Sequence, residues 1–429
     1  MHMAFRCFTP LLVAECFSLA RASTAHQESK SLLSFTNFVH HFSRSYTGTK
    51  EYDERQALFQ ARAHAIHEHN RKPNRRWTAA INKFSDRTAS ELARVRGWKR
   101  RGSPNELVQH RNNQKNHRVQ ADSGLSLTQT DRGHVLPALS KSVSWDFLNA
   151  SKRHYDQGSC GSCWAIASAV LLETHSEAHG NDRTFSAQEL VSCVPNPQHC
   201  GGSGGCEGAT MELAMEWVMK HGLADDSQEP YYASNGECRA DTKQSGSSLL
   251  QIHSRWAIPA LEEQKLESKA ISPSNQFGMH GWERLPANDY KAVLQALQDG
   301  PVGVSVAASD WYAYSSGIFD ECVKDAIIDH AVVLIGYGSD STDKYWLLKN
   351  SWGAEWGEDG LMRLLRRDHQ EENDGSWCGI DNQPELGSGC DGGPSQVTVC
   401  GTCGILYDTV VPHFRGDSSQ AKHRAIEHH

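Results

Sequence analysis

The sequence predicts an α+β protein in which a small helical unit precedes one large domain with two lobes. Residues 30–98 are rich in helix formers with spaced aromatic side chains, and they read as two helices followed by a strand near Thr78–Phe84. Ile166–His175 carries small and apolar residues at helical spacing. Val332–Ile335 and Tyr345–Lys349 have the apolar composition of strands. Helices and strands therefore both contribute to the fold.

Composition excludes several classes of protein. The 429 residues carry 43 basic and 51 acidic side chains, so the net charge of −8 does not favour nucleic-acid binding. The mean hydropathy is −0.57. No stretch reaches the ~18 uninterrupted apolar residues of a membrane span, so no membrane anchor is expected. A hydrophobic fraction of 38%, with 12 Trp and 13 Phe, supplies a sizeable core and excludes a disordered chain.

The chain divides into five expected segments. Phe8–Ala20 is a short apolar stretch behind Arg6, and Ala20-Arg21-Ala22 has the form of a signal-peptidase site, so residues 1–22 read as a signal peptide. The odd count of 13 cysteines fits an oxidising compartment with one thiol left unpaired. The other expected segments are the helical unit at 30–100, a polar linker or processing region at 101–135, the large domain at 136–414 and a disordered tail at 415–429.

Three residues far apart in the chain carry the candidate chemistry. Cys163 opens the helix-spaced stretch, where the positive end of the helix dipole favours thiolate over thiol. Gln157 could place an amide N–H beside the backbone N–H of Cys163, and two such donors form an oxyanion hole. His330 can serve as the general base for a thiol, and the side-chain carbonyl of Asn350 can orient its imidazole.

These residues stand in motifs that resemble the papain family of cysteine peptidases. Gln157–Trp164 reads Q-G-S-C-G-S-C-W, and Asp329-His330-Ala331 and Asn350-Ser351-Trp352-Gly353 give the histidine and asparagine contexts. The histidine follows the cysteine by 167 residues, and the asparagine follows 20 residues later. The resemblance implies a papain-like fold, with an active-site cleft between a helical lobe and a β-barrel-like lobe. It further implies Cys163 as nucleophile, His330 as base, Asn350 as orienter, Gln157 as oxyanion donor and Trp352 as a shield over the Asn–His contact.

The helical unit resembles the inhibitory propeptide of cathepsin L-type enzymes. Glu51, Arg55, Phe59, Ile66 and Asn70 fall at the family's interspersed spacing, and Arg62 stands where the family has Asn. Ala80, Asn82, Phe84 and Asp86 match the G-x-N-x-F-x-D piece that follows, except that Ala80 replaces Gly. The resemblance implies a zymogen whose propeptide crosses the cleft in reverse as an intramolecular inhibitor. We also hypothesise that protonation near pH 5–6 of the nine histidines between His26 and His134, which include His64, His67 and His69, weakens propeptide docking and triggers maturation. The alternative is that they are solvated surface histidines.

Disulfides are also implied by the resemblance. Cys160 pairs with Cys206, and Cys193 with Cys238. Cys322 pairs with a cysteine in a Cys-Gly-Ile context, for which Cys378 and Cys403 are both candidates. The distance from Asn350 favours Cys378, whereas the residues after Cys403 better resemble the closing strand of the family. Cys200, Cys390, Cys400 and the remaining candidate then pair among themselves, and residues 385–400 form an insertion that the family pattern lacks.

The same resemblance implies a pocket for the second residue before the scissile bond. Gly208 pairs through its backbone with the substrate, and Ala209 stands where the family has a second glycine. The floor of the pocket is Gln383 or Asp408, depending on which Cys-Gly-Ile aligns. Apolar walls favour aliphatic or aromatic side chains, and an aspartate floor adds tolerance of arginine. The implied walls are Thr210, Met211, Ser305, Ile328 and Ala331.

The predicted function is that of a thiol-dependent endopeptidase, made as a secreted zymogen, that cleaves protein and peptide substrates through a Cys163 thioester. No cofactor or metal is expected. Zinc at Cys160-x2-Cys163 would need a matching second pair, and although Cys400-x2-Cys403 exists, no histidine pair stands at finger spacing. The alternative is a non-catalytic papain-fold binding or inhibitor protein, which the presence of both Cys163 and His330 disfavours. We expect a monomer, with a glycosylation sequon at Asn149-Ala150-Ser151, that travels to a lysosome-like vacuole or out of the cell.

Overall fold

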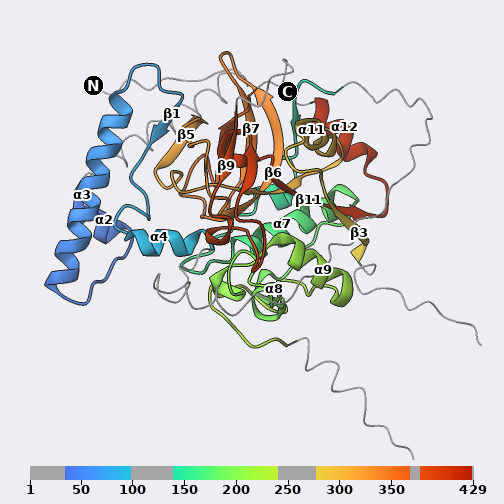
Figure 1. Ribbon diagram of the computed structural model, residues 1–429, viewed down its shortest axis with the longest axis horizontal. Helices are drawn as coiled ribbons and strands as arrows, with labels where there is room; N and C mark the ends of the chain where they lie inside the picture. The colour runs from blue at the N-terminus through green and yellow to red at the C-terminus, as the bar shows by residue number, and fades with distance from the viewer. Residues whose placement is uncertain (1–33, 98–138, 240–276, 368–376, 428–429) are drawn as a thin grey trace, which may run out of the picture.

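The computed structural model describes residues 34–97, 139–239, 277–367 and 377–427 (Figure 1). The expected signal peptide and the whole of the expected linker at 101–135 lie outside the described residues. Residues 34–97, which we call the N-terminal unit, run along one flank of the larger unit that begins at residue 139 (Figure 1). None of the helices in the described ranges combines the length and the apolar composition that a bilayer crossing requires.

Local sequence signals account for the helices of the N-terminal unit. Ser34 caps the first helix by accepting a hydrogen bond from the backbone N–H of Asn37. Thr88 and Glu91 form a reciprocal capping box at the start of the last helix. The rings of Phe38 and Phe59 pack the first two helices together, with centroids 4.9 Å apart. The elements are α2 (Phe35–His41), α3 (Thr49–Arg71), β1 (Trp77–Ala79) and α4 (Ala89–Val95).

One lobe of the larger unit is helical. Its central helix α7 (Cys163–Ala178) is apolar on nearly every face and is buried along almost its whole length, as expected for a helix inside a core. The shorter helices α8 (Ala187–Cys193) and α9 (Met211–His221) pack beside it (Figure 1). The remaining short elements of this lobe are α6 (Asn149–Lys152) and the 3-10 turn η1 (Gly205–Glu207).

The other lobe is built on a sheet whose strand order is β1-β5-β8-β7-β6-β4-β11-β3, with β2 paired to β6. Its central strand β6 (His330–Ser339) is buried along nine of its ten residues and packs against α7. The N-terminal unit contributes the edge strand β1, which pairs antiparallel with β5. The other strands are β2 (Val143–Ser144), β3 (Met279–Arg284), β4 (Val302–Val306), β5 (Tyr314–Phe319), β7 (Lys344–Lys349), β8 (Leu361–Leu365) and β11 (Asp408–Phe414).

Two further features complete this lobe. A separate hairpin pairs β9 (Cys378–Asp381) with β10 (Val397–Cys400). The helices α11 (Tyr290–Asp299) and α12 (Ser419–Glu427) lie together beside the sheet (Figure 1). The short 3-10 turns are η5 (Pro384–Leu386) and η6 (Thr402–Gly404). The whole is the two-lobed α+β arrangement that the sequence predicts.

Two predictions about local structure are wrong. The strand expected at residues 78–84 covers only Trp77–Ala79, because the chain then turns so that the side chain of Asn82 donates to the backbone carbonyl of Tyr312. The tail expected to be disordered from residue 415 instead forms α12. Ala425 is fully buried in that helix, and Lys422 pairs with Asp299 at 2.7 Å, so tertiary contacts stabilise a segment that is polar in composition.

The disulfides agree with the implied pairs in two cases and differ in the third. Cys160 is bonded to Cys206, and Cys193 to Cys238. The preference for a Cys322–Cys378 bond is wrong, because Cys322 is bonded to Cys403. Cys403 lies just before β11, the closing strand, whereas Cys378 faces Cys400 across the β9–β10 hairpin and is bonded to it. The remaining bond joins Cys200 to Cys390.

Candidate active site

Cys163 is the first residue of α7, and among the described residues it is the one cysteine outside a disulfide. The Cys160–Cys206 bond holds the loop that leads into the helix, and Gly161 donates its backbone N–H to the Cys206 carbonyl at 2.8 Å. The thiol therefore sits at the positive end of a long buried helix. The loop that precedes it is fixed to the segment around Cys206.

His330 and Asn350 meet in the other lobe. His330 begins β6 and Asn350 follows β7, and these neighbouring strands bring Nε2 of His330 within 2.8 Å of Oδ1 of Asn350. The backbone N–H of Ser351 donates to the same oxygen at 2.8 Å, which supports its assignment as an acceptor. Nε2 therefore carries the hydrogen. Nδ1 is buried and has no hydrogen-bond partner within the described ranges.

Trp352 covers this contact. It is fully buried, its ring centroid lies 4.9 Å from that of His330, and it stacks on Tyr312 at 5.1 Å with an interplanar angle of 10°. The ring excludes water from the Asn350–His330 hydrogen bond, and in a low-dielectric setting that bond is stronger.

Gln157 is also fully buried, and its side chain is held at both ends. Its Oε1 accepts from the hydroxyl of Ser351 at 2.6 Å, while its Nε2 donates to the backbone carbonyls of Val95 and Cys160 at 2.6 and 2.8 Å. Val95 belongs to the N-terminal unit. A carbonyl of that unit therefore occupies the donor for which the sequence predicts an oxyanion role.

The N-terminal unit covers the thiol directly. The backbone carbonyl of Arg96 lies 3.5 Å from the Cys163 sulfur. Gly97 has φ +87, and a Cβ there would meet that sulfur and the Gly161 carbonyl at 3.3 Å. A Cβ on Gly208 would lie 1.9 Å from the Gly97 carbonyl. The unit therefore docks by backbone-to-backbone approach that only glycine allows at these positions.

The docked N-terminal unit changes the protonation of Cys163 and His330. Burial raises the pKa of the Cys163 thiol to about 12, although nearby backbone N–H groups act in the opposite direction. Burial also lowers the pKa of His330 to about 4, against the effect of Asn350. The helix dipole was expected to favour thiolate, but desolvation dominates while the N-terminal unit is docked. In this state both groups are neutral near pH 7.

One pocket brings most of the expected substrate-binding residues together. It encloses about 380 Å³ of empty space, including its open mouth, and it contains both Cys163 and His330. Ala209, Thr210 and Met211 line it from the helical lobe, and Ser305, Ile328 and Ala331 line it from the sheet. Gly208 lies beside it, under Gly97.

Neither Asp408 nor Gln383 lines this pocket, but Asp408 lies directly behind one of its wall residues, Ser305. Ser305 and Asp408 face each other across β4 and β11, and the Ser305 hydroxyl donates to the carboxylate at 2.8 Å. Arg284 pairs with the same carboxylate at 2.8 Å. Gln383 is exposed. Burial and the neighbouring charge of Asp408 raise the pKa of Glu212 to about 8, so this acidic pair retains a proton near neutral pH.

Some residues of the pocket were not expected from the sequence. Arg96 lines it and pairs with the buried Asp329 at 2.6 Å. Gly387 and Ser388 line it too, although they belong to the insertion. No sequence pattern indicates that the insertion lies at the cleft. The Cys200–Cys390 bond would have indicated this position, but the sequence left that pairing unassigned.

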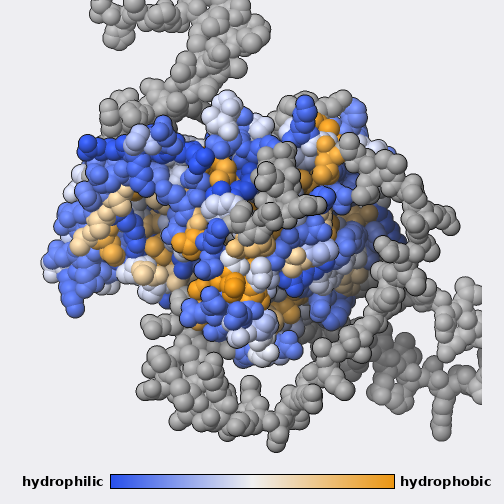
Figure 2. Space-filling view, turned by 45° about the horizontal axis from the view of Figure 1, so that its top comes forward, coloured by the Kyte–Doolittle hydropathy of each residue, from blue (hydrophilic) through white to orange (hydrophobic). Residues whose placement is uncertain are grey.

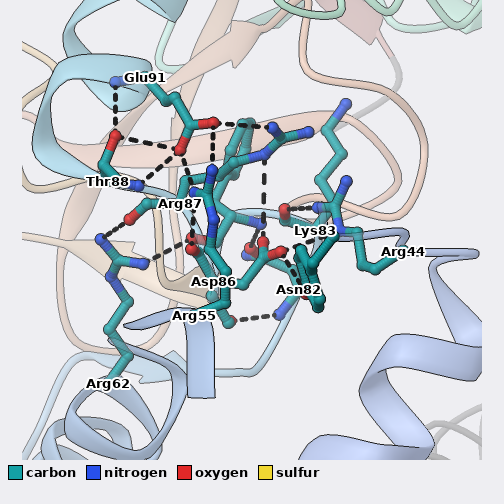
Figure 3. Close-up of polar contacts among 12 residues, drawn as sticks. Arg44, Arg55, Arg62, Asn82, Lys83, Asp86, Arg87, Thr88 and Glu91 are labelled. Atoms are coloured by element: carbon teal, nitrogen blue, oxygen red, sulfur yellow. Dashed lines mark hydrogen bonds and ion pairs between the residues drawn. The ribbon is translucent and has the colours of Figure 1, made fainter. Parts of the chain in front are cut away.

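A polar network holds the N-terminal unit together (Figure 3). Glu91 receives two hydrogen bonds from Arg55 and also caps Thr88. Burial opposes ionisation of Glu91, but these bonds lower its pKa to about 2. Because the pKa falls from 4.5, the network's contribution to stability is fully present above about pH 4.5 and is lost only as the pH falls toward 2. Mild acid therefore leaves this network intact.

Arg62, the residue that departs from the family pattern, takes part in the same network (Figure 3). Its guanidinium donates to the backbone carbonyl of Phe84 at 2.9 Å and to that of Arg87 at 2.5 Å. It thus ties α3 to the loop before α4. Of the histidines on α3, His64 and His67 are exposed, whereas His69 is buried with its Nε2 3.1 Å from the Trp77 carbonyl.

Replacing Arg62 by alanine should speed self-processing of the full-length protein at least about tenfold at acid pH, because even one hydrogen bond from a charged donor is worth ~1.5–3 kcal/mol. The measurement is the rate at which the full-length band disappears on gels. The matched control is Arg71→Ala on the same helix, where the side chain is 70% exposed and pairs only loosely with Glu68. Equal rates for both variants and the parent would contradict the role of Arg62.

The described residues contain no group of His, Cys, Asp and Glu side chains arranged to hold a metal ion. The chemistry that this geometry offers is that of a thiol, an imidazole and an amide donor.

Comparison with known proteins agrees with this geometry. Residues 139–388 match the model of the papain family cysteine protease, and residues 35–92 match that of the cathepsin propeptide inhibitor domain. The chain is 32% identical over 330 residues to cysteine endopeptidase RepA of Oryza sativa subsp. japonica, which covers 75% of this chain and 74% of that protein. It is 29% identical over 392 residues to cysteine protease XCP2 of Arabidopsis thaliana, which covers 87% of this chain and 94% of that protein.

Among solved structures, digestive procathepsin L 3 of Tenebrio molitor larval midgut superposes with a TM-score of 0.58 at 25% identity, over 88% of this chain and 97% of that one. The N-terminal unit is thus an inhibitory propeptide docked on its own protease domain. The chain belongs to the papain family of cysteine proteases and is the zymogen of a cysteine endopeptidase.

Proposed function

We propose that Cys163 is the nucleophile of this endopeptidase, with His330 as its base and acid. The observation that carries the proposal is that the free thiol at the start of α7 shares one pocket with His330. Asn350 holds Nε2 of the imidazole and leaves Nδ1 without a partner among the described residues. Nδ1 can therefore accept the thiol proton once the N-terminal unit has left.

The steps follow from these positions. With the N-terminal unit removed, water reaches the pair, the desolvation that keeps it neutral is relieved, and the helix dipole favours thiolate beside imidazolium. The thiolate attacks the peptide carbonyl. The Gln157 amide, released from Val95, and the Cys163 backbone N–H hold the oxyanion. His330 protonates the leaving amine, and water then hydrolyses the thioester. Asn350 acts as a positioning residue, and Trp352 shields it.

The pocket supports a preference for an apolar side chain at the second residue before the scissile bond. Met211, Ile328 and Ala331 supply apolar walls. Asp408 already has partners in Arg284 and Ser305, so an arginine in the substrate would have to compete for its charge. We propose that the enzyme favours aliphatic or aromatic residues there and tolerates arginine less well.

We further propose that the protein is a monomer that follows the secretory pathway to a lysosome-like vacuole or out of the cell. Five disulfides in the described residues suit an oxidising compartment. Figure 2 shows a face that is mostly hydrophilic, with hydrophobic patches among the hydrophilic residues, and a hydrophilic face suits a monomer. Asn149 of the sequon is exposed at the start of α6, which supports glycosylation there.

An active-site label tests the nucleophile. The protein is processed in acid and incubated with an epoxide that alkylates active-site thiols, and the adduct is then located by peptide mapping. We expect one adduct per molecule, at Cys163, together with loss of hydrolysis of an unfolded protein substrate. Labelling at another residue, or hydrolysis that survives full labelling, would overturn the proposal.

A further inference from the structure

Residues 384–391, which we call the strap, run between the two lobes beside the active-site pocket. The backbone N–H of Ser388 donates to the carbonyl of Ile328 at 2.7 Å. The carbonyl of the next residue, Gly389, accepts from the N–H of Gly201 at 3.1 Å. Ile328 leads into β6 in the sheet lobe, and Gly201 lies between α8 and α9 in the helical lobe. Consecutive strap residues therefore bond to both walls of the cleft.

The strap cannot easily move aside. Cys390 is joined to Cys200 by a disulfide, and the neighbouring Asp391 donates its N–H to the Gln198 carbonyl at 2.8 Å. The Asp391 carboxylate also lies 2.7 Å from Nδ1 of His199. A covalent bond and two polar contacts thus tie the strap to the helical lobe.

The strap also lies close against the walls. A Cβ on Gly387 would meet the Ile328 carbonyl at 2.1 Å. Backbone is packed on backbone at this contact. An extended peptide needs about 4.7–4.9 Å from its neighbouring strand, so it cannot pass beneath the strap.

The strap stands at a defined place along the cleft. Gly387 and Ser388 line the same pocket as Ala209, Thr210 and Ile328. This is the pocket assigned above to the second residue before the scissile bond.

We propose that the strap ends the N-terminal side of the substrate cleft after the second residue before the scissile bond. The inference rests on the proposed function. A longer substrate must turn out of the cleft over the strap, so its third and earlier residues make no productive contacts with the walls. Internal peptide bonds remain cleavable, but recognition on this side stops at two residues.

Substrate length tests the strap. The probes are acetylated fluorogenic peptides with two, three or four residues before the reporter, all sharing the same last two. In an open cleft, remote contacts raise kcat/KM with length. We expect kcat/KM of the parent enzyme to stay within about twofold across the series. In the Cys200→Ser/Cys390→Ser double variant we expect kcat/KM to rise about fivefold or more from two residues to four, with little change for the shortest peptide.

The matched control is Cys378→Ser/Cys400→Ser, which removes the bond across the β9–β10 hairpin but leaves the strap tied to Cys200. It should retain the flat length profile of the parent. A severalfold rise of kcat/KM with length in the parent enzyme would overturn the strap proposal, and this measurement needs no variant. Absence of any hydrolysis of the two-residue peptide would instead count against the proposed function, so the two failures are distinguishable.

Discussion

Replacing Cys163 by alanine will lower kcat/KM for a two-residue fluorogenic substrate by at least about 10⁴-fold, as loss of a nucleophile does in other peptidases. Cys163 is the one free thiol among the described residues, and no serine or threonine is expected to replace it beside His330. The oxyanion donors would remain and account for the residual rate. The variant is activated with an added protease, because it is expected not to process itself.

Ser159→Ala is the matched control for this variant. Ser159 lies in the same loop, four residues before the nucleophile, and is exposed. Its replacement should leave kcat/KM unchanged and self-processing intact. A Cys163→Ala protein that kept more than about one hundredth of the parent activity would contradict the assignment of the nucleophile.

The docked N-terminal unit should slow alkylation of Cys163 by iodoacetamide at least about 100-fold relative to the processed enzyme at neutral pH, because only the thiolate reacts. Burial raises the pKa of the thiol to about 12 in the zymogen. Its alkylation rate should therefore climb about tenfold per pH unit up to pH 9. The processed enzyme, with its thiolate and imidazolium, should react at a nearly constant rate between about pH 5 and 8. Mass spectrometry of the intact protein gives both rates.

A variant at Gly97 tests whether burial of the Cys163 thiol causes the slow alkylation of the zymogen. Gly97 lies on the sulfur with φ +87, where a side chain is strained, and a Cβ would already be 3.3 Å from the sulfur. Gly97→Val should displace Arg96 and Gly97 from the Cys163 sulfur. The alkylation rate of the zymogen should then approach that of the processed enzyme. Exposed Gly180, also at positive φ but with no atom near its Cβ position, offers the control Gly180→Val. Equal alkylation rates in zymogen and processed enzyme would show that the docked segment does not protect the thiol.

Much of the site could be predicted because its signals are local. The placement of Cys163 depends on a loop that runs straight into an apolar helix, and both are visible within twenty residues. His330 and Asn350 each stand at one end of an apolar strand, and neighbouring strands bring such ends together. In the N-terminal unit, the spacing of Arg55 and Phe59 along one helix predicted the docked domain. Arg62 departs from the family pattern on that helix, and only the structure shows which backbone carbonyls it binds.

Other features depended on contacts that local sequence does not encode. The thiol was expected to be ionised from its helix position alone, yet Arg96 and Gly97 arrive from far upstream and bury it. The helix at the C-terminus is stabilised by burial of Ala425, so its polar composition misled the prediction of a disordered tail.

The sequence by itself determined the fold class, the family and the residues that form the candidate catalytic group, since each is carried by a short contiguous motif. Only the tertiary structure decided which cysteine meets Cys322, that Asp408 lies behind the pocket wall at Ser305, and where the insertion lies. Cys378 and Cys403 have nearly the same local context, so the strand register that pairs Cys378 with Cys400 settles the matter. The strap owes its place at the cleft to a disulfide between residues 190 positions apart, and no local pattern specifies a contact of that range.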